Sequence, residues 1–174
     1  MIRKTLSNII KFTLLTIVIF YGITEINDNY RGPDIVGEGT MINVENIPET
    51  RKEILTESKK HIGTPYSFGS KDPASGFGNS GYVSYVYEKS LNFKLPLGSR
   101  NMYSDKSGKT LTLSELNLGD LMFFSHDGSK IQHVGIYIDE NHFIHSPRTG
   151  RVVSIDEIDR YWKQKFVIGK TYLK

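Results

Sequence analysis

Apolar residues follow two different patterns along the chain, a single run near the start and a periodic spacing later. The run is mostly apolar, covers residues 12–23 and comes after Arg3, Lys4 and Lys11. A basic start followed by a short apolar stretch is typical of a secretory signal or a signal-anchor. Basic residues on that side favour a cytoplasmic N-terminus and an exported remainder. We expect residues 1–26 to be this segment, anchoring the protein to the membrane or directing its secretion.

Polar residues with Gly and Pro fill the next stretch. Residues 27–48 include Gly32-Pro33 and Gly37-Glu38-Gly39 and show no regular apolar period, which is typical of a linker. We expect one folded domain over residues 49–174. It would lie in the cell envelope, on the exported side of the cytoplasmic membrane.

Two helices are predicted in the first half of this domain. One begins at Pro48 and runs to about residue 62, with Ile54, Leu55 and Ile62 facing the core. The second begins near residue 79 and runs to about residue 89, where apolar residues recur at helical spacing. Its buried stripe is expected to consist of Val83, Val86 and Tyr87.

The second half of the domain is predicted to consist mainly of strands. A polar loop over residues 98–110 comes first, and a short helix over 156–162 interrupts the strands. Alternation in residues 133–138 places the apolar side chains on one face and His133 on the other. Helices first and strands later indicate an α+β fold. We expect the helices to pack on a mostly antiparallel sheet of five to six strands, including residues 121–124, 133–138, 142–146, 151–154 and 166–173.

Composition narrows the possible functions. The formal net charge is +3, and Lys and Arg form no dense block, so nucleic acid is not expected as a partner. The chain has no cysteine, which excludes disulfides, thiolate-bound zinc and thiol catalysis. The oligomeric state stays open.

Five short motifs together resemble the NlpC/p-sixty family of cell-wall peptidases, over about residues 50–174. The resemblance implies a papain-like fold and a substrate in the peptide stems of peptidoglycan, often cut between D-glutamate-type and diamino-acid residues. The motifs are Gly63-Thr-Pro-Tyr-Ser-Phe-Gly69, Gly76-Phe-Gly-Asn-Ser-Gly-Tyr-Val83, Leu118-Gly-Asp-Leu-Met-Phe-Phe124, His133-Val-Gly-Ile-Tyr-Ile138 and Phe143-Ile-His-Ser146.

The resemblance assigns roles to individual positions. Asn79 occupies the place of the family's cysteine nucleophile, and Gly78 replaces the aspartate before it. His133 corresponds to the general base and His145 to the polar residue that orients the base. Tyr66 matches a tyrosine that lines the pocket near the nucleophile. No cofactor is implied.

An asparagine side chain cannot carry out the first step of such a reaction, which is nucleophilic attack. The amide nitrogen is not nucleophilic, because its lone pair is delocalised, whereas a thiolate beside an imidazole at a helix N-terminus is activated. Three roles stay open for Asn79: a favourable N-cap residue, a hydrogen-bonding partner of a bound peptide, or a substitution introduced to trap a substrate. The paired change at Gly78 argues for natural drift.

The neighbouring Ser80 is the alternative nucleophile. Adjacent residues on a helix point roughly 100° apart around the axis, so we expect Ser80 to point away from His133 and to act as a first-turn or packing hydroxyl, or to contact substrate. The two histidines also suit a partial metal site. His126, Asp127 and His142 are candidate zinc ligands, but no established zinc motif occurs, and we expect no metal.

These observations favour an exported domain that binds peptidoglycan stem peptides and has lost hydrolysis. Two alternatives remain: an active peptidase or acyltransferase that uses Ser80, and a structural domain that binds a protein partner. The resemblance also predicts that Asn79→Cys restores weak activity, and that adding Gly78→Asp restores more.

Overall fold

The computed structural model describes residues 35–36, 40–41 and 47–173. The predicted signal segment, residues 1–26, lies outside these residues, and the domain boundaries stay a prediction. Within the expected linker, β1 (Ile35–Val36) and β2 (Thr40–Met41) pair as a short antiparallel hairpin. In the part of the chain that is described, no helix is both long and apolar enough to span a membrane.

Both predicted helices are present. Helix α2 covers Glu49–Lys59 and helix α3 covers Asn79–Leu91, and the two pack against each other. Ile54 and Leu55 are buried, as are the three residues of the predicted stripe on α3. Ile62 is 49% exposed, so its predicted core position was wrong. Because α2 ends at Lys59, Ile62 lies in the turn that follows and leaves the helix face.

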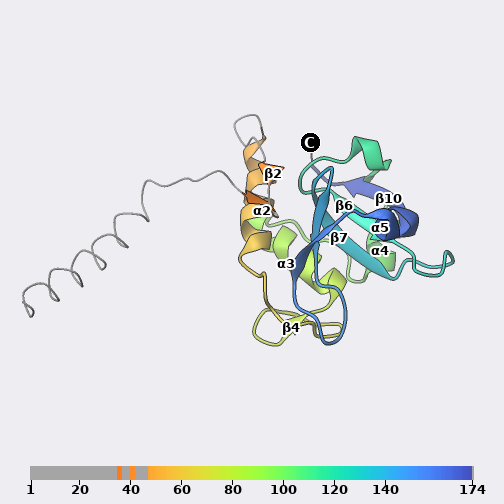
Figure 1. Ribbon diagram of the computed structural model, residues 1–174. Helices are drawn as coiled ribbons and strands as arrows, with labels where there is room; N and C mark the ends of the chain where they lie inside the picture. Colours follow the sequence, from red (N-terminus) through yellow and green to blue (C-terminus); the bar gives the residue numbers. More distant parts are fainter. Residues whose placement is uncertain (1–34, 37–39, 42–46, 174) are drawn as a thin grey trace, which may run out of the picture. The chain divides into compact units, whose positions relative to one another are not determined.

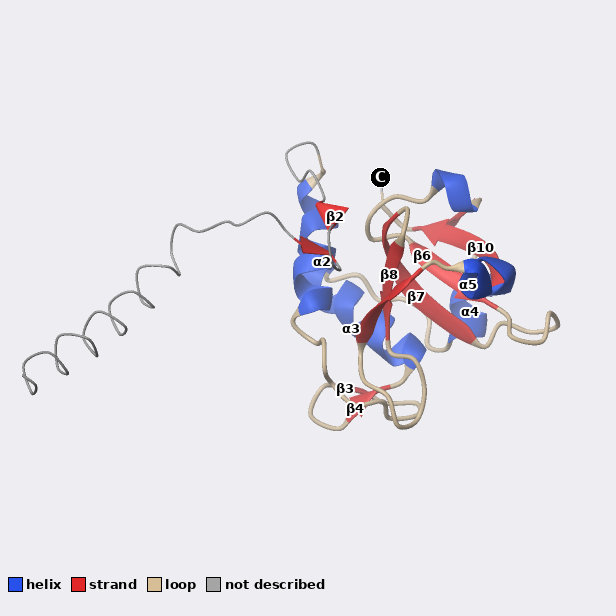
Figure 2. Ribbon diagram, in the orientation of Figure 1, coloured by secondary structure: helices blue, strands red, loops and turns tan. Residues whose placement is uncertain are grey.

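The sheet confirms the predicted α+β class. It has six strands in the order β5-β10-β6-β7-β8-β9, and every neighbouring pair is antiparallel. Figure 2 shows its strands beside the helices. A separate two-stranded sheet joins β3 (Lys71–Asp72) to β4 (Gly76–Phe77), just before α3. The six strands are β5 Lys109–Leu111, β6 Leu121–Phe124, β7 His133–Asp139, β8 His142–His145, β9 Ser154–Glu157 and β10 Phe166–Thr171.

Three predicted segments were wrong in place or type. The expected loop at 98–110 contains helix α4 (Ser99–Ser104), which is held to the core by the fully buried Met102. The strand predicted at 151–154 is β9, three residues later, because pairing with β8 runs on to Glu157. The following helix is therefore α5 (Arg160–Lys165), whose backbone is capped by the side chain of Asp159.

Helices lie on both sides of the sheet. Helices α2 and α3 adjoin one face, and α5 lies on the other side (Figure 1). Val134, Ile136 and Ile138 of β7 join the core beneath α3, whereas Tyr137 packs in the cluster beneath α5. The alternation predicted for β7 is confirmed. It places His133 on the α5 side, where its ring lies near Trp162.

A buried ion pair joins α2 to the turn before β6. Arg51 Nη1 lies 2.9 Å from Asp120 Oδ1, and Arg51 also donates to the carbonyl of Leu118. Asp120 accepts a further bond from the backbone N–H of Asn117. Its side chain is fully buried, so removing one partner would leave an uncompensated charge in the interior.

Candidate functional site

Asn79 is the first residue of α3, at the end of a backbone segment held by neighbouring loops. Gly78 before it is extended, and its N–H donates to the carbonyl of Ser70 at 2.9 Å. The half-buried Asn79 side chain donates from Nδ2 to the carbonyl of Gln132 at 3.4 Å. That distance is longer than the usual 2.9–3.0 Å, so the bond is weak.

The position of Asn79 rules out the capping role. The N-cap residue is Gly78, which has no side chain, and no side-chain cap bond is formed at this helix. Asn79 itself lies inside the helix, so it does not supply the stabilisation that an asparagine gives at the cap.

The structure brings His133 and His145 together. His133 begins β7 and His145 ends β8, and His133 Nε2 lies 2.8 Å from His145 Nδ1. Gly135 of β7 leaves room for the side chains of β8 beside this pair. A β-carbon there would lie 2.7 Å from the ring of Phe143 and 3.2 Å from the β-carbon of His145, so only glycine leaves room for both side chains.

The histidine pair is enclosed by aromatic rings. His133 is 3% exposed and His145 is fully buried. The Trp162 ring centre lies 5.6 Å from that of His133 and 5.3 Å from that of His145, while Phe124 and Phe143 contact the pair from the sheet. Burial lowers the pKa of His133 well below its usual value, and the nearby His145 and His126 act in the same direction, against Asp156. His133 is therefore neutral near pH 7.

Asp156 on β9 is a neighbour of this pair that sequence reasoning missed. Its Oδ2 lies 3.1 Å from His145 Nε2. Within the described residues Nε2 has no partner in hydrogen-bonding geometry, so the contact is close without being an aligned hydrogen bond. Contact with His145 lowers the pKa of the Asp156 carboxyl, so it is ionised. Strand β9 was predicted too early in the chain, and the register of Ser154 opposite His145 was not visible in the sequence.

The carboxylate allows the tautomers to be assigned. A negative charge beside Nε2 of His145 favours a proton on that nitrogen, which leaves Nδ1 to accept from Nε2–H of His133. The remaining nitrogen of His133, Nδ1, then carries no proton and is an acceptor. This is the form that a general base requires.

A cavity of about 740 Å³ lies at the N-terminus of α3. Tyr66, Asn79 and Ser80 all line it, so the structure places these three predicted residues in one site. The two histidines are not part of its described lining and lie in the interior instead. Asn79 connects the two regions, because it bonds the carbonyl of Gln132, the residue before His133. Within the described part of the chain, no hydrogen bond joins Ser80 to either histidine.

Other polar groups near the site are engaged elsewhere. His126 Nδ1 lies 3.1 Å from the hydroxyl of Tyr161, and Asp127 accepts from Ser129. His142 pairs with Asp139 at the far end of the hairpin. In residues 35–36, 40–41 and 47–173, no group of three or more His, Asp or Glu residues is arranged to hold a metal.

Comparison with known proteins identifies related chains. A sequence profile of the NlpC/P60 family matches residues 63–171. Murein DD-endopeptidase MepH of Escherichia coli is 33% identical over 123 residues, which are 70% of this chain and 45% of that protein. Gamma-DL-glutamyl hydrolase of Bacillus subtilis is 33% identical over 113 residues, which are 64% of this chain and 27% of that protein. The match thus spans less than half of either relative.

Solved structures resemble the domain as well. The NlpC/p60 domain of the peptidoglycan hydrolase SagA superposes with a TM-score of 0.60 at 29% identity, covering 70% of this chain and 97% of that one. An NLP/P60 family protein of Staphylococcus aureus, described as similar to lipoprotein, superposes with a TM-score of 0.63 at 27% identity, covering 80% of this chain and 45% of that one.

Proposed function

Because the chain belongs to the NlpC/P60 family and has its papain-like α+β fold, we propose that its domain binds peptidoglycan stem peptides without cutting them. Asn79 is the observation that carries this proposal. It stands at the first turn of α3, where the family motif has a cysteine. The protein is then an inactive relative of endopeptidases that cut between γ-D-glutamyl and diamino-acid residues.

The amide of Asn79 supplies none of the chemistry of a thiol. A thiolate at this position would gain from the positive end of the helix dipole and would attack the peptide carbonyl. The amide nitrogen of Asn79 is instead a hydrogen-bond donor to the carbonyl of Gln132. His133 is neutral and able to accept a proton, but no acidic group at position 79 provides one.

The cavity supports a binding role. Its volume of about 740 Å³ lies within the range of small-ligand pockets. Tyr66 offers a ring and a hydroxyl beside Asn79, and Ser80 offers a second hydroxyl. A relative named as a murein endopeptidase supports a peptidoglycan peptide as the ligand.

The proposed location follows from the ligand and from the first 26 residues. Peptidoglycan lies outside the cytoplasmic membrane, and a basic start followed by an apolar run suits export. We therefore propose a cell-envelope protein on the exported side, either membrane-anchored or secreted. Binding there would hold or regulate active wall enzymes.

A second candidate function is hydrolysis or acyl transfer by Ser80. Its support is that Ser80 lines the same cavity as Asn79. A serine nucleophile requires a base within hydrogen-bond reach, and in the described residues Ser80 has no such bond to His133 or His145. We therefore favour binding.

Calorimetry of the purified chain with a synthetic stem tetrapeptide tests the proposal. Saturable binding that is weakened by Tyr66→Ala supports it. The matched control is Tyr161→Ala, which removes a half-exposed tyrosine outside the cavity and should leave affinity unchanged. A chain that binds no peptide at all would instead be a structural or partner-binding domain.

A further inference from the structure

Within the described residues, the charged side chains that line the cavity beside Asn79 are all basic. Its described lining contains the cations Lys71 and Arg100 and no Asp or Glu. The Lys71 ammonium is ion-paired with Glu88, so its charge is largely neutralised. Among the described residues, the guanidinium of Arg100 has no carboxylate partner. Within the described residues, Arg100 is therefore the lining cation without a carboxylate partner, and it also borders a second cavity beside Tyr103 and Lys130.

Arg100 and Asn79 bond to neighbouring carbonyls of the same loop. Arg100 Nε donates to the carbonyl of Ile131 at 3.3 Å, and Asn79 Nδ2 donates to the next carbonyl, that of Gln132. The two side chains thus hold consecutive residues of one loop and line the same cavity. With Nε engaged, the two terminal nitrogens of Arg100 are left to grip a carboxylate through paired hydrogen bonds.

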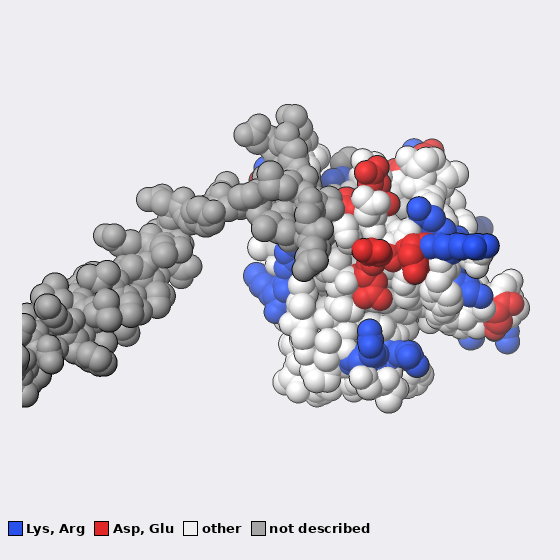
Figure 3. Space-filling model, in the orientation of Figure 1, with Lys and Arg blue, Asp and Glu red and all other residues white. Residues whose placement is uncertain are grey.

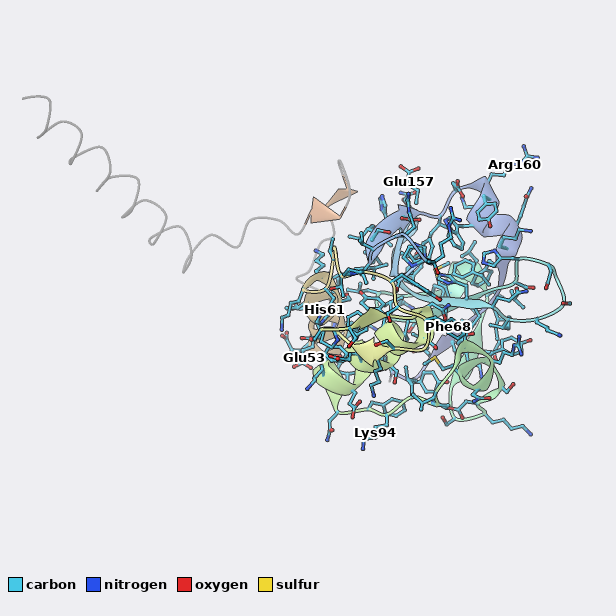
Figure 4. All side chains as sticks on the ribbon, turned by 90° about the horizontal axis from the view of Figure 1, so that it is seen from below. Glu53, His61, Phe68, Lys94, Glu157 and Arg160 are labelled. Carbon is cyan, nitrogen blue, oxygen red and sulfur yellow. The ribbon has the colours of Figure 1, made fainter. Side chains whose placement is uncertain are left out.

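Two apolar side chains border the same cavity. Phe68 is 91% exposed and Leu97 is 68% exposed, and both belong to its lining. Figure 4 shows Phe68 well apart from Arg160, which lies on α5. Large apolar groups left in water beside a cavity often mark a binding surface. They suit the small apolar residues of a peptide, while Arg100 suits its charge.

On the face drawn in Figure 3, basic side chains form several groups, some beside acidic side chains and some apart from them. Within the described residues, the lining of the cavity contains basic side chains and no acidic one.

We propose that Arg100 selects peptide ligands that carry a free carboxylate, and that the domain discriminates against the same peptide when that group is a carboxamide. The inference rests on the proposed function. A glutamate linked through its γ-carboxyl keeps its α-carboxylate free, so a stem peptide presents such a group within its chain. Amidation of that carboxylate removes both the charge and one of its two acceptor oxygens.

Calorimetry with two synthetic stem tetrapeptides, identical except that the D-glutamate α-carboxyl is free or amidated, tests this assignment. We expect the free acid to bind the wild-type chain roughly tenfold more tightly, the ratio that about 1.4 kcal/mol produces. Arg100→Gln should bring the two affinities together, and Arg100→Lys should keep part of the difference. Arg160→Gln, an exposed arginine outside the cavity, is the matched control and should keep it all.

Three other results would overturn the role proposed for Arg100. Equal affinity of the wild type for the two peptides would overturn the role of Arg100 and leave the proposed function standing. A preference that survives Arg100→Gln would also overturn it. Failure of both peptides to bind would overturn the proposed function, and this inference with it. Arg100 is exposed, and thermal unfolding of each variant checks that the fold is kept.

Discussion

His133 and His145 are hydrogen-bonded to each other inside the domain, with 2.8 Å between Nε2 of the first and Nδ1 of the second. The two residues that the family motifs assign as base and orienting residue thus lie together. The difference from the family motifs is at position 79, where the side-chain amide of Asn79 donates to the carbonyl of Gln132. We infer that the site keeps its buried histidine pair and differs from the family at position 79, beside the cavity.

Stability should depend on pH through His133. Burial lowers its pKa in the folded state, whereas the unfolded chain has the ordinary value near 6.5. The unfolded state therefore binds a proton first as the pH falls. The contribution of His133 is complete above about pH 6.5 and is lost below it, by at most about 1.4 kcal/mol per pH unit. Urea unfolding between about pH 7.5 and 5 measures this loss.

The variant His133→Gln is the comparison for that series. It removes the titrating group and keeps a hydrogen-bonding side chain. Its unfolding free energy should change less over the same pH range. Parallel curves for the two chains would mean that His133 does not titrate as its burial implies.

Asp156 should fix the tautomer of His145. In the wild type, nitrogen NMR should find the proton of His145 on Nε2, beside the carboxylate at 3.1 Å. Asp156→Ala removes that charge, and the share of the Nδ1–H form should rise. The matched control is Glu157→Ala, an exposed acid on the same strand (Figure 4). Unchanged ring shifts in Asp156→Ala would contradict the assignment.

Asn79→Cys should restore weak hydrolysis of a stem peptide. The substitution loses a bond of 3.4 Å to Gln132, so the cost in unfolding free energy should be below about 1 kcal/mol. Release of fragments is followed by chromatography. Adding His133→Gln should abolish the release, and Asn79→Ala should show none. A folded, inert Asn79→Cys chain would show that the site has changed beyond its nucleophile.

Adding Gly78→Asp should not increase that activity, contrary to the expectation from the family motif. A β-carbon at position 78 would lie 2.9 Å from the backbone nitrogen of Gly69 and 3.2 Å from the carbonyl of Ser67. The loop would have to shift, at roughly 1–3 kcal/mol. Gly78→Ala isolates this cost in a thermal unfolding experiment. A double variant that is both more active and equally stable would refute the steric argument.

Much of the fold was predictable because the spacing of apolar residues along the sequence indicates which side chains are buried. The spacing of Val83, Val86 and Tyr87 predicted the buried face of α3, and the alternation in β7 separated its apolar residues from His133. Helix α4 was missed because its segment is mostly polar and only Met102 in it is fully buried, with Tyr103 packing on the core beside it. Strand β9 was misplaced because its extent depends on pairing with β8.

The candidate site was predictable only where a motif names its residues. Tyr66, Asn79 and Ser80 were found through the motif and do line one cavity. Asp156 and Arg100 belong to no motif. Asp156 is brought to the site by the register of β9 on β8, and Arg100 by its bond to the carbonyl of Ile131. Both relationships join residues that are far apart in the sequence. The capping role considered for Asn79 failed because the helix begins at Asn79 itself, one residue earlier than a cap at that position requires.

Digestion of isolated cell walls by the purified wild-type chain tests the central claim most directly, with Asn79→Cys and Ser80→Ala assayed beside it. We predict that the wild type and Ser80→Ala bind the wall and release no stem-peptide fragments, whereas Asn79→Cys releases some. Fragments released by the wild type and lost in Ser80→Ala would contradict the account, because they would make Ser80 a working nucleophile and the domain an enzyme.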